Sequence, residues 1–274
     1  NSESNVRLEK PLIKLATSEK EYQSMIEISK NKKEYGIEML DKISLEFWNS
    51  IFDRKLIGGL ISHEDGRLNP IILMKLLMKN LDKINVNKVE DNVIKIKKNV
   101  NSFNKKWKIY LESKRLLNQD YIVICSALNT QKLLKPLGHQ ILLEPILGQV
   151  LELELEQDTF DWNKWPAVLN YQSINFIHQN SNHIFMGATI ENGSSPCVIH
   201  KKEMLYIKNT APEWIKKSKV INEWFGIRAK PQNEPAPLLK ELEKGLLINT
   251  GHYRNGILLA PSCAEWIELK INNQ

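Results

Sequence analysis

The chain has 274 residues, a length that suits one large domain or two modest ones. Hydrophobic residues make up 42% of it and charged residues 26%, which is ordinary for a globular protein with a sizeable core. The net charge of +6 comes from scattered lysines, and basic runs with interleaved stacking aromatics are absent, so we expect no nucleic-acid partner. No apolar run approaches the roughly 18 residues of a membrane helix, so we expect no membrane span.

The cysteines and histidines give no sign of a metal site. Cys125, Cys197 and Cys263 are widely spaced and contain no Cys-x-x-Cys pair, which is typical of a reducing cytoplasm. His178 and His183 are five residues apart without carboxylate or cysteine partners at ligand spacing. We therefore interpret them as exposed turn histidines and predict no bound metal.

Helix-start signals mark the first third of the chain. Ser18 and Glu21 form a capping box, which predicts a helix that runs to about residue 30. Apolar residues within 45–52 indicate a second helical or irregular stretch, and residues 56–63 read as a strand. Asn69-Pro70 predicts the start of a helix that is apolar almost all round, so we expect this helix to be buried.

Strands dominate the middle of the chain. Residues 121–125 form a short continuous apolar run, typical of a strand covered on both faces, and residues 150–156 alternate strictly, as in a strand with one wet face. The other expected elements are an antiparallel pair at 93–96 and 107–111, a meander at 168–176 and 183–190, a helix at 201–209 and a strand at 219–229.

The segment near the C-terminus has the composition of a binding site. The apolar run at 245–250 predicts a buried strand, and a helix is expected over 262–269 with Pro261 in its first turn. Between them lies a polar loop bracketed by Gly251 and Gly256, whose small size permits close approach to a ligand. The N–H groups of the following helix would favour an anionic group.

The run at 251–261, GHYRNGILLAP, resembles the C-terminal signature of the D-amino acid oxidase superfamily of FAD enzymes, most closely its glycine oxidase branch from thiamine biosynthesis. The segment from Trp224 to Pro231 is similar to the family's Trp-x-Gly-Leu-Arg-Pro motif. Weaker similarities follow the family's order at residues 64–70, 148–150 and 187–191. Five ordered matches carry more weight than any single motif.

The resemblance implies an α/β (α+β) fold in which a Rossmann-like FAD-binding portion is interleaved with a mixed or antiparallel-sheet substrate domain. We assign residues 1–70 and 145–226 to the substrate domain, and residues 71–144 and 227–274 to the FAD-binding portion. The family's opening Gly-x-Gly-x-x-Gly pattern occurs nowhere in this chain, so the FAD-binding portion is expected to be incomplete here. A naturally truncated homologue without flavin is the alternative.

By resemblance, Arg228 is the main clamp for a substrate carboxylate, and Arg254 lies beside it at the flavin edge. A guanidinium matches a carboxylate in a fixed plane, which a lysine does not. Phe176 is expected at the substrate, where the family often presents a tyrosine. No side chain is assigned as a catalytic group, and His252 is expected to pack by the flavin rather than act as a base.

The same resemblance places a set of residues against the cofactor, while Ala127 stands where the family usually has glycine. The expected FAD contacts are Val89, Ser126, Gly226, Gly251, His252, Tyr253, Arg254, Asn255, Gly256, Ile257 and Leu258.

The implied function is FAD-dependent oxidative deamination of glycine or a small D- or N-methyl amino acid. Its products would be a 2-oxo acid, ammonia and hydrogen peroxide, with dioxygen as the oxidant and thiamine thiazole synthesis as the role. A cytoplasmic location and assembly as a homo-oligomer are consistent with the resemblance. The alternatives are a quinone-linked D-amino acid dehydrogenase and a non-catalytic remnant that binds a partner.

Overall fold

The computed structural model describes residues 6–100, 106–156, 161–180, 182–192 and 200–273. The chain forms two compact units, and the expected mixed α/β fold is confirmed. Unit 1 comprises residues 1–87, 149–189 and 198–225, and unit 2 comprises residues 88–148, 190–197 and 226–274. The helix at Pro70–Lys83 therefore lies in unit 1. From the sequence, most of its residues were assigned to the FAD-binding portion.

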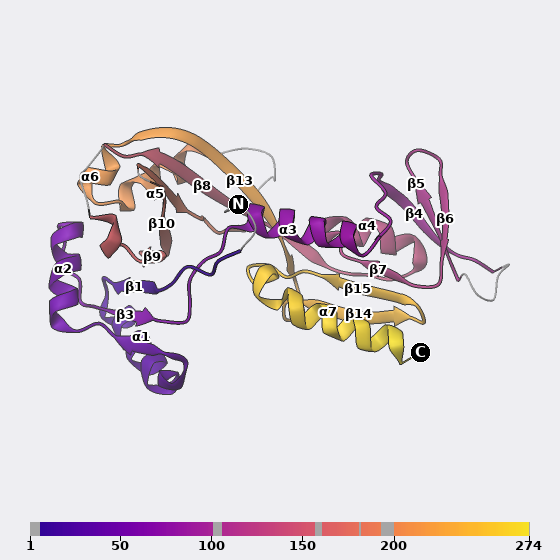
Figure 1. Ribbon diagram of the computed structural model, residues 1–274, viewed down its shortest axis with the longest axis horizontal. Coiled ribbons are helices and arrows are strands. Elements are labelled where there is room, and N and C mark those ends of the chain that lie inside the picture. Colours follow the sequence, from indigo (N-terminus) through magenta and orange to yellow (C-terminus); the bar gives the residue numbers. More distant parts are fainter. Residues whose placement is uncertain (1–5, 101–105, 157–160, 181, 193–199, 274) are drawn as a thin grey trace. The chain divides into compact units, whose positions relative to one another are not determined.

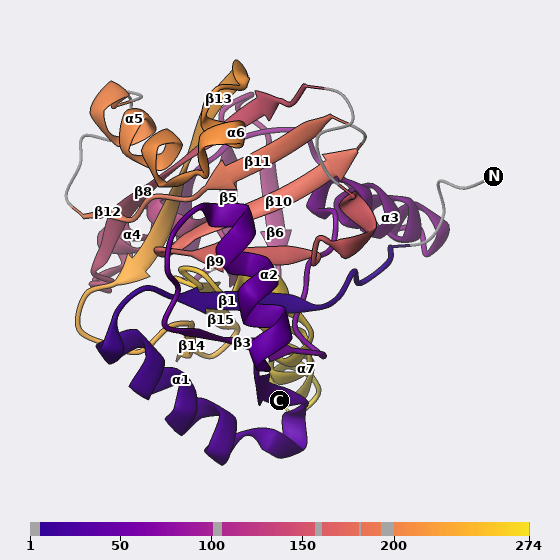
Figure 2. The same ribbon diagram turned by 90° about the vertical axis from the view of Figure 1, so that its left-hand side faces the viewer.

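A mixed sheet is the framework of unit 1 (Figure 2). Its strand order is β12-β8-β11-β10-β9-β1-β3-β2, with β13 also paired to β8. The strands are β1 (Leu12–Ala16), β2 (Ile37–Met39), β3 (Gly58–Ser62), β8 (Leu143–Glu154), β9 (Val168–Tyr171), β10 (Ile174–Asn180), β11 (His183–Gly187), β12 (Glu191–Asn192) and β13 (Lys219–Pro231). Strands β8 and β13 continue from one unit into the other, and β12 belongs to unit 2.

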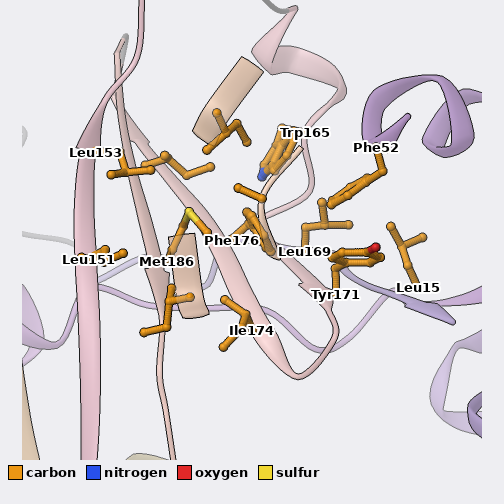
Figure 3. Packing of buried hydrophobic residues seen from close by; sticks show 14 of the residues in the cluster. Leu15, Phe52, Leu151, Leu153, Trp165, Leu169, Tyr171, Ile174, Phe176 and Met186 are labelled. Atoms are coloured by element: carbon orange, nitrogen blue, oxygen red, sulfur yellow. The ribbon is translucent and has the colours of Figure 1, made fainter. Parts of the chain in front are cut away.

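The core of unit 1 lies between this sheet and the helices α2 (Lys42–Phe52), α5 (Lys201–Thr210) and α6 (Glu213–Lys216). Figure 3 shows its aromatic centre, where the ring of Phe52 lies 4.3 Å from that of Tyr171 and 5.9 Å from that of Phe176. Phe176 is 0% exposed. The structure thus places Phe176, predicted to contact substrate, inside the hydrophobic core.

Helix-start signals in the sequence fix the positions of two helices in unit 1. The capping box at Ser18 and Glu21 is formed, and α1 runs over Glu19–Asn31. Asn69 caps α3 (Pro70–Lys83) by accepting hydrogen bonds from two backbone N–H groups. The expectation that α3 is buried is wrong, since none of its residues is buried and Ile71 is 65% exposed. Its apolar residues lack a covering layer within the described part of the chain.

Two further expectations for unit 1 need correction. Residues 168–176 are not one strand but β9 and β10, because Gln172 and Ser173 turn the chain with φ angles of 48° and 64°. The histidines are not exposed turn residues either. The ring of His178 stacks on Trp162 at 3.9 Å, and His183 Nδ1 lies 3.1 Å from Glu152 Oε1, a carboxylate partner that is remote in sequence.

Unit 2 is built around a small sheet of order β14-β15-β7 and a separate antiparallel meander of order β4-β5-β6 (Figure 1). Its core joins both sheets through Trp107, Ile124 and Ile248, among other apolar residues. The elements are β4 (Val93–Lys98), β5 (Trp107–Leu111), β6 (Leu116–Gln119), β7 (Ile122–Ile124), α4 (Thr130–Leu134), β14 (Leu238–Glu243), β15 (Leu246–Thr250) and α7 (Gly256–Asn272).

Helix α7 starts earlier than its sequence indicates. It begins at Gly256, so Pro261 lies inside the helix rather than in a first turn beginning near Ser262. Because proline lacks an N–H, this position removes one hydrogen bond of the helical ladder. The polar loop after Gly251 is therefore short: it ends at Asn255, and α7 begins at the next residue.

Replacing Phe176 by alanine should lower the free energy of unfolding by about 3–5 kcal/mol, because the ring leaves a cavity in a closed core. Chemical denaturation measures this change. Phe225, which is 37% exposed, is the matched control, and Phe225→Ala should have a much smaller effect. Equal losses in the two variants would contradict the core placement of Phe176.

Candidate functional site

Two parallel strands of unit 2 end side by side and define the candidate site. Strand β15 pairs with β7 in parallel, with Leu246 opposite Ile122 and Ile248 opposite Ile124. The carboxyl ends of adjacent parallel strands meet at one edge of a sheet, where α/β proteins bind ligands. The segments that follow them, from Cys125 and from Gly251, therefore emerge together.

Buried hydroxyl groups tie these two strand ends to each other. Thr130 Oγ1 donates to Thr250 Oγ1 at 3.2 Å and lies 3.2 Å from Ser126 Oγ. Thr250 Oγ1 is also 3.4 Å from the carbonyl oxygen of Ala127. Thr130 is 0% and Thr250 2% exposed, so water does not compete for these bonds. The network holds both segments at a fixed separation.

A cavity of about 300 Å³ opens between the two segments. One of its lining residues, Asn249, has a buried side-chain oxygen, Oδ1, that accepts no hydrogen bond from the described residues. Such an atom costs stability unless a ligand or water donates to it. The cavity is lined by Cys125, Ala127, Ala229, Asn249, Thr250, Gly251, His252, Tyr253, Gly256 and Ala260.

The loop from Gly251 to Asn255 has a constrained backbone. Gly251 has a φ of +66°, and a Cβ there would lie 2.9 Å from Cγ of Pro231. Tyr253 also has a positive φ of 54°, and its N–H donates to the carbonyl of Ala229 at 3.1 Å. Asn255 gives α7 no side-chain cap. The first N–H groups of α7 thus remain available to an anionic group.

The two predicted arginines interact electrostatically. Arg228 is half-buried, and burial together with the charge of Arg254 lowers the pKa of its guanidinium, while Tyr253 opposes that shift. Arg254 itself is exposed. Two like charges held near one another favour a bound anion, because a carboxylate relieves their repulsion.

His252 is held by packing. Burial lowers the pKa of its imidazole, and its Nε2 lies 3.6 Å from the sulfur of Cys263 on α7. The neutral form is therefore favoured at neutral pH. The ring bridges the loop to the helix and adds no third positive charge beside the arginines.

Ala127 adopts the backbone conformation that a glycine would favour. Its φ is +47°, in the left-handed region, although it carries a Cβ. The chain thus makes the tight turn after β7 without glycine, at an energetic cost. Ala127 thus keeps a left-handed conformation where the family usually has glycine, and it lines the cavity.

Two of the segments with a weaker resemblance to the family, at 148–150 and 187–191, are joined by hydrogen bonds between Gln149 and Thr189. The N–H of Gln149 donates to Thr189 Oγ1 at 2.9 Å, and the N–H of Thr189 donates to the carbonyl of Gln149 at 3.2 Å. The side-chain oxygen of Gln149 accepts from the N–H of His200 at 2.7 Å. Both residues are buried, so these motif positions join three segments of the unit.

The structure brings together part of the predicted set. Gly251, His252, Tyr253 and Gly256 line the cavity, and Arg254 and Asn255 belong to the same loop. The remaining predicted residues are not among those that line it. Arg228 precedes the lining residue Ala229 on β13, Val89 precedes β4, Ser126 borders a second cavity, Gly226 is exposed on β13, Ile257 and Leu258 are exposed on α7, and Phe176 is in the core of unit 1.

Several lining residues were missed from the sequence. Asn249 and Thr250 could have been found, since they are polar residues that end an otherwise apolar strand. Ala229 and Ala260 carry no chemical signal, and only the fold brings them to the cavity.

In the part of the chain that the structure describes, no helix is long and apolar enough to cross a membrane. Among the same residues, no group of three or more histidine, cysteine or acidic side chains is placed to hold a metal ion.

A known protein family matches most of this chain. The model of the FAD dependent oxidoreductase family matches residues 5–268, so the chain belongs to that family. FAD is therefore the cofactor of its family.

Glycine oxidases are among the related proteins. The enzyme of Pseudomonas putida is 27% identical over 159 residues, which cover 56% of this chain and 42% of that protein. The enzyme of Pseudomonas aeruginosa is 26% identical and is covered to 39%, so the match spans well under half the length of these relatives. The structure of glycine oxidase from Geobacillus kaustophilus superposes with a TM-score of 0.83 at 20% identity, covering 100% of this chain and 74% of that one.

The same fold serves other oxidases. Iminodiacetate oxidase from Chelativorans sp. BNC1 has a TM-score of 0.76 at 18% identity, covering 93% of this chain and 70% of its own. The FAD-bound L-alpha-glycerophosphate oxidase from Mycoplasma pneumoniae has a TM-score of 0.82 at 14% identity, covering 98% and 74%. At these identities the likeness establishes the fold alone.

Replacing Ala127 by glycine should raise the free energy of unfolding by about 1 kcal/mol, because the left-handed conformation penalises a Cβ. Denaturant titration measures this change. Ala260→Gly, in the interior of α7, should instead lower stability by about 1 kcal/mol, since glycine disfavours a helix. A loss of stability in Ala127→Gly would contradict the strained turn.

Proposed function

We propose that the protein is an FAD-dependent oxidase of glycine or a small D- or N-methyl amino acid, with dioxygen as the oxidant. The observation that carries this proposal is that the half-buried Arg228 on β13 interacts electrostatically with Arg254 of the loop that precedes α7. The substrate offers a carboxylate, which a guanidinium binds through two parallel hydrogen bonds. The partly buried Arg228 is the stronger candidate for this contact, because screening by water is weaker there.

The described residues fit part of an FAD molecule. A volume of about 300 Å³ holds only a portion of a dinucleotide, and the unpartnered acceptor on Asn249 calls for a donor from the ligand. The first N–H groups of α7 would face an electron-rich edge of that ligand. The Gly-x-Gly-x-x-Gly loop that contacts the phosphates in this fold class is absent from the sequence.

An open strand edge supports the expectation that the FAD-binding portion is incomplete here. Among the described strands, β7 pairs with β15 alone. The N–H of Ile122 donates to Gly245 on the β15 side, so the peptide groups of Val123 face the other way. A cavity of about 580 Å³ lined by Ile94, Ile122 and Ile124 adjoins this edge. We propose that a parallel apolar strand of a dinucleotide-binding segment pairs with it.

Bound FAD would supply two-electron redox chemistry, by which a hydride leaves the α-carbon and two electrons with two protons reach dioxygen to give hydrogen peroxide. The chain's part is to hold the substrate. Arg228 orients the carboxylate, and the neutral His252 packs against α7 without competing for that anion. The resulting imine reacts with water to give a 2-oxo acid and ammonia, or methylamine where the substrate is an N-methyl amino acid. We propose a cytoplasmic role in thiamine thiazole synthesis.

The visible spectrum of the protein expressed from its complete reading frame should show flavin bands that bleach on anaerobic addition of glycine. Return of the bands with peroxide on admitting air would identify an oxidase, and return only with a quinone would identify the dehydrogenase alternative. A preparation without flavin would overturn the enzyme proposal and favour the partner-binding remnant. Flavin that stays oxidised with glycine, sarcosine and D-alanine would overturn the substrate class.

Arg228→Ala should reduce kcat/KM for the amino acid by about 30- to 900-fold, which corresponds to the loss of about 2–4 kcal/mol from a desolvated ionic hydrogen bond. Peroxide release under steady-state conditions measures this ratio. Arg115, an exposed arginine elsewhere in unit 2, provides the control variant Arg115→Ala, whose ratio should match the wild type. Unchanged turnover in Arg228→Ala would remove this residue from the carboxylate site.

A further inference from the structure

The guanidinium of Arg228 lies directly against the backbone of Gly148. These residues are on the paired strands β13 and β8, within unit 2. A Cβ built on Gly148 would be 2.2 Å from Nη1, 2.5 Å from Nη2 and 2.6 Å from Cζ of Arg228. These distances are far inside van der Waals contact. The planar end of Arg228 therefore occupies the space that any other residue at position 148 would need.

The backbone of Gly148 does not itself require glycine. It is a buried residue within β8, and it is not among the residues with a positive φ. Glycine inside a strand weakens the strand, and it often marks a close approach by another group. The group that approaches here is the guanidinium. By contrast, Gly226 on β13 has nothing within 4 Å of the position of its Cβ.

The guanidinium of Arg228 is also influenced by the charge of Arg254. Arg228 and Arg254 carry like charges and interact with one another. An arginine side chain has four rotatable bonds, and repulsion between the like charges of Arg228 and Arg254 bears on which of its conformers is occupied. A flat peptide surface without a side chain lets the planar group settle against it in one orientation.

We propose that Gly148 is a positioning residue, which sets the place and orientation of the Arg228 guanidinium for binding a carboxylate. The proposal rests on the function given above and deepens it. Because the group in the way is the far end of a flexible side chain, an added methyl group displaces the guanidinium and leaves the strands in place. Gly148→Ala should therefore impair carboxylate binding without a matching loss of stability.

The test uses the full chain labelled with ¹⁵N-arginine, with sodium acetate as the carboxylate probe. In the wild type, the Arg228 Nε–H signal should shift in a saturable way on titration. In Gly148→Ala, that signal should already differ before acetate is added, and the dissociation constant should rise by about tenfold to a hundredfold. The melting temperature should stay within about 3 °C of the wild type.

Leu142→Ala, at a residue that is 43% exposed and lies just before β8, is the control, and its Arg228 signal and acetate affinity should equal those of the wild type. An unchanged Arg228 signal in Gly148→Ala overturns the inference, whatever acetate does. A wild type in which acetate leaves Arg228 unaffected overturns the carboxylate clamp of the proposed function, while the unliganded signals still decide the role of Gly148.

A second variant covers the case in which Gly148→Ala does not fold. The double variant Gly148→Ala/Arg228→Ala removes the guanidinium that the methyl group would strike. Folding restored in the double variant supports the contact, and a double variant that also fails to fold contradicts it, because the clash then lies with the backbone. The Arg228→Ala single variant is the reference for both.

Discussion

The parallel pairing of β7 and β15 is the constraint on which the candidate site depends. Because the two strands run in the same direction, the turn after Ile124 and the loop after Thr250 leave the sheet at one edge. The buried hydroxyl network then fixes their separation, and the short loop delivers the N-terminus of α7 to the same place. An antiparallel arrangement would send the two segments to opposite edges, and no common cavity would form.

Two residues at this edge of the sheet adopt backbone conformations that their side chains disfavour. Ala127 and Tyr253 both hold positive φ angles without being glycine, and both line the cavity. Such conformations persist where the surrounding hydrogen bonds over-determine them, and they often occur at functional sites. Here the bonds from Thr250 to Ala127 and from Tyr253 to Ala229 do so. The strained backbone at Ala127 and Tyr253 therefore helps to shape the cavity.

Short-range signals made much of the fold predictable. Ser18 and Asn69 start their helices where expected, since a cap acts within one turn, and the apolar run at Leu246–Thr250 forms the expected buried strand. The failures involve contacts distant in sequence. The exposure of α3 depends on which layers cover it, and the place of Phe176 depends on the packing of α2 over the sheet. Likewise, periodicity gives no sign that Gly148 meets Arg228.

The charges around the cavity bear on the protonation state of the substrate amine. No aspartate or glutamate is among the described residues that line it, whereas Arg228 and Arg254 lie by the same loop. Glu144, the nearby acid on β8, already pairs with Lys230 at 2.6 Å. A positive local potential attracts the carboxylate of an amino acid but disfavours its ammonium group. In the proposed reaction this potential would favour the neutral amine, whose lone pair assists departure of a hydride from the α-carbon without a side-chain base.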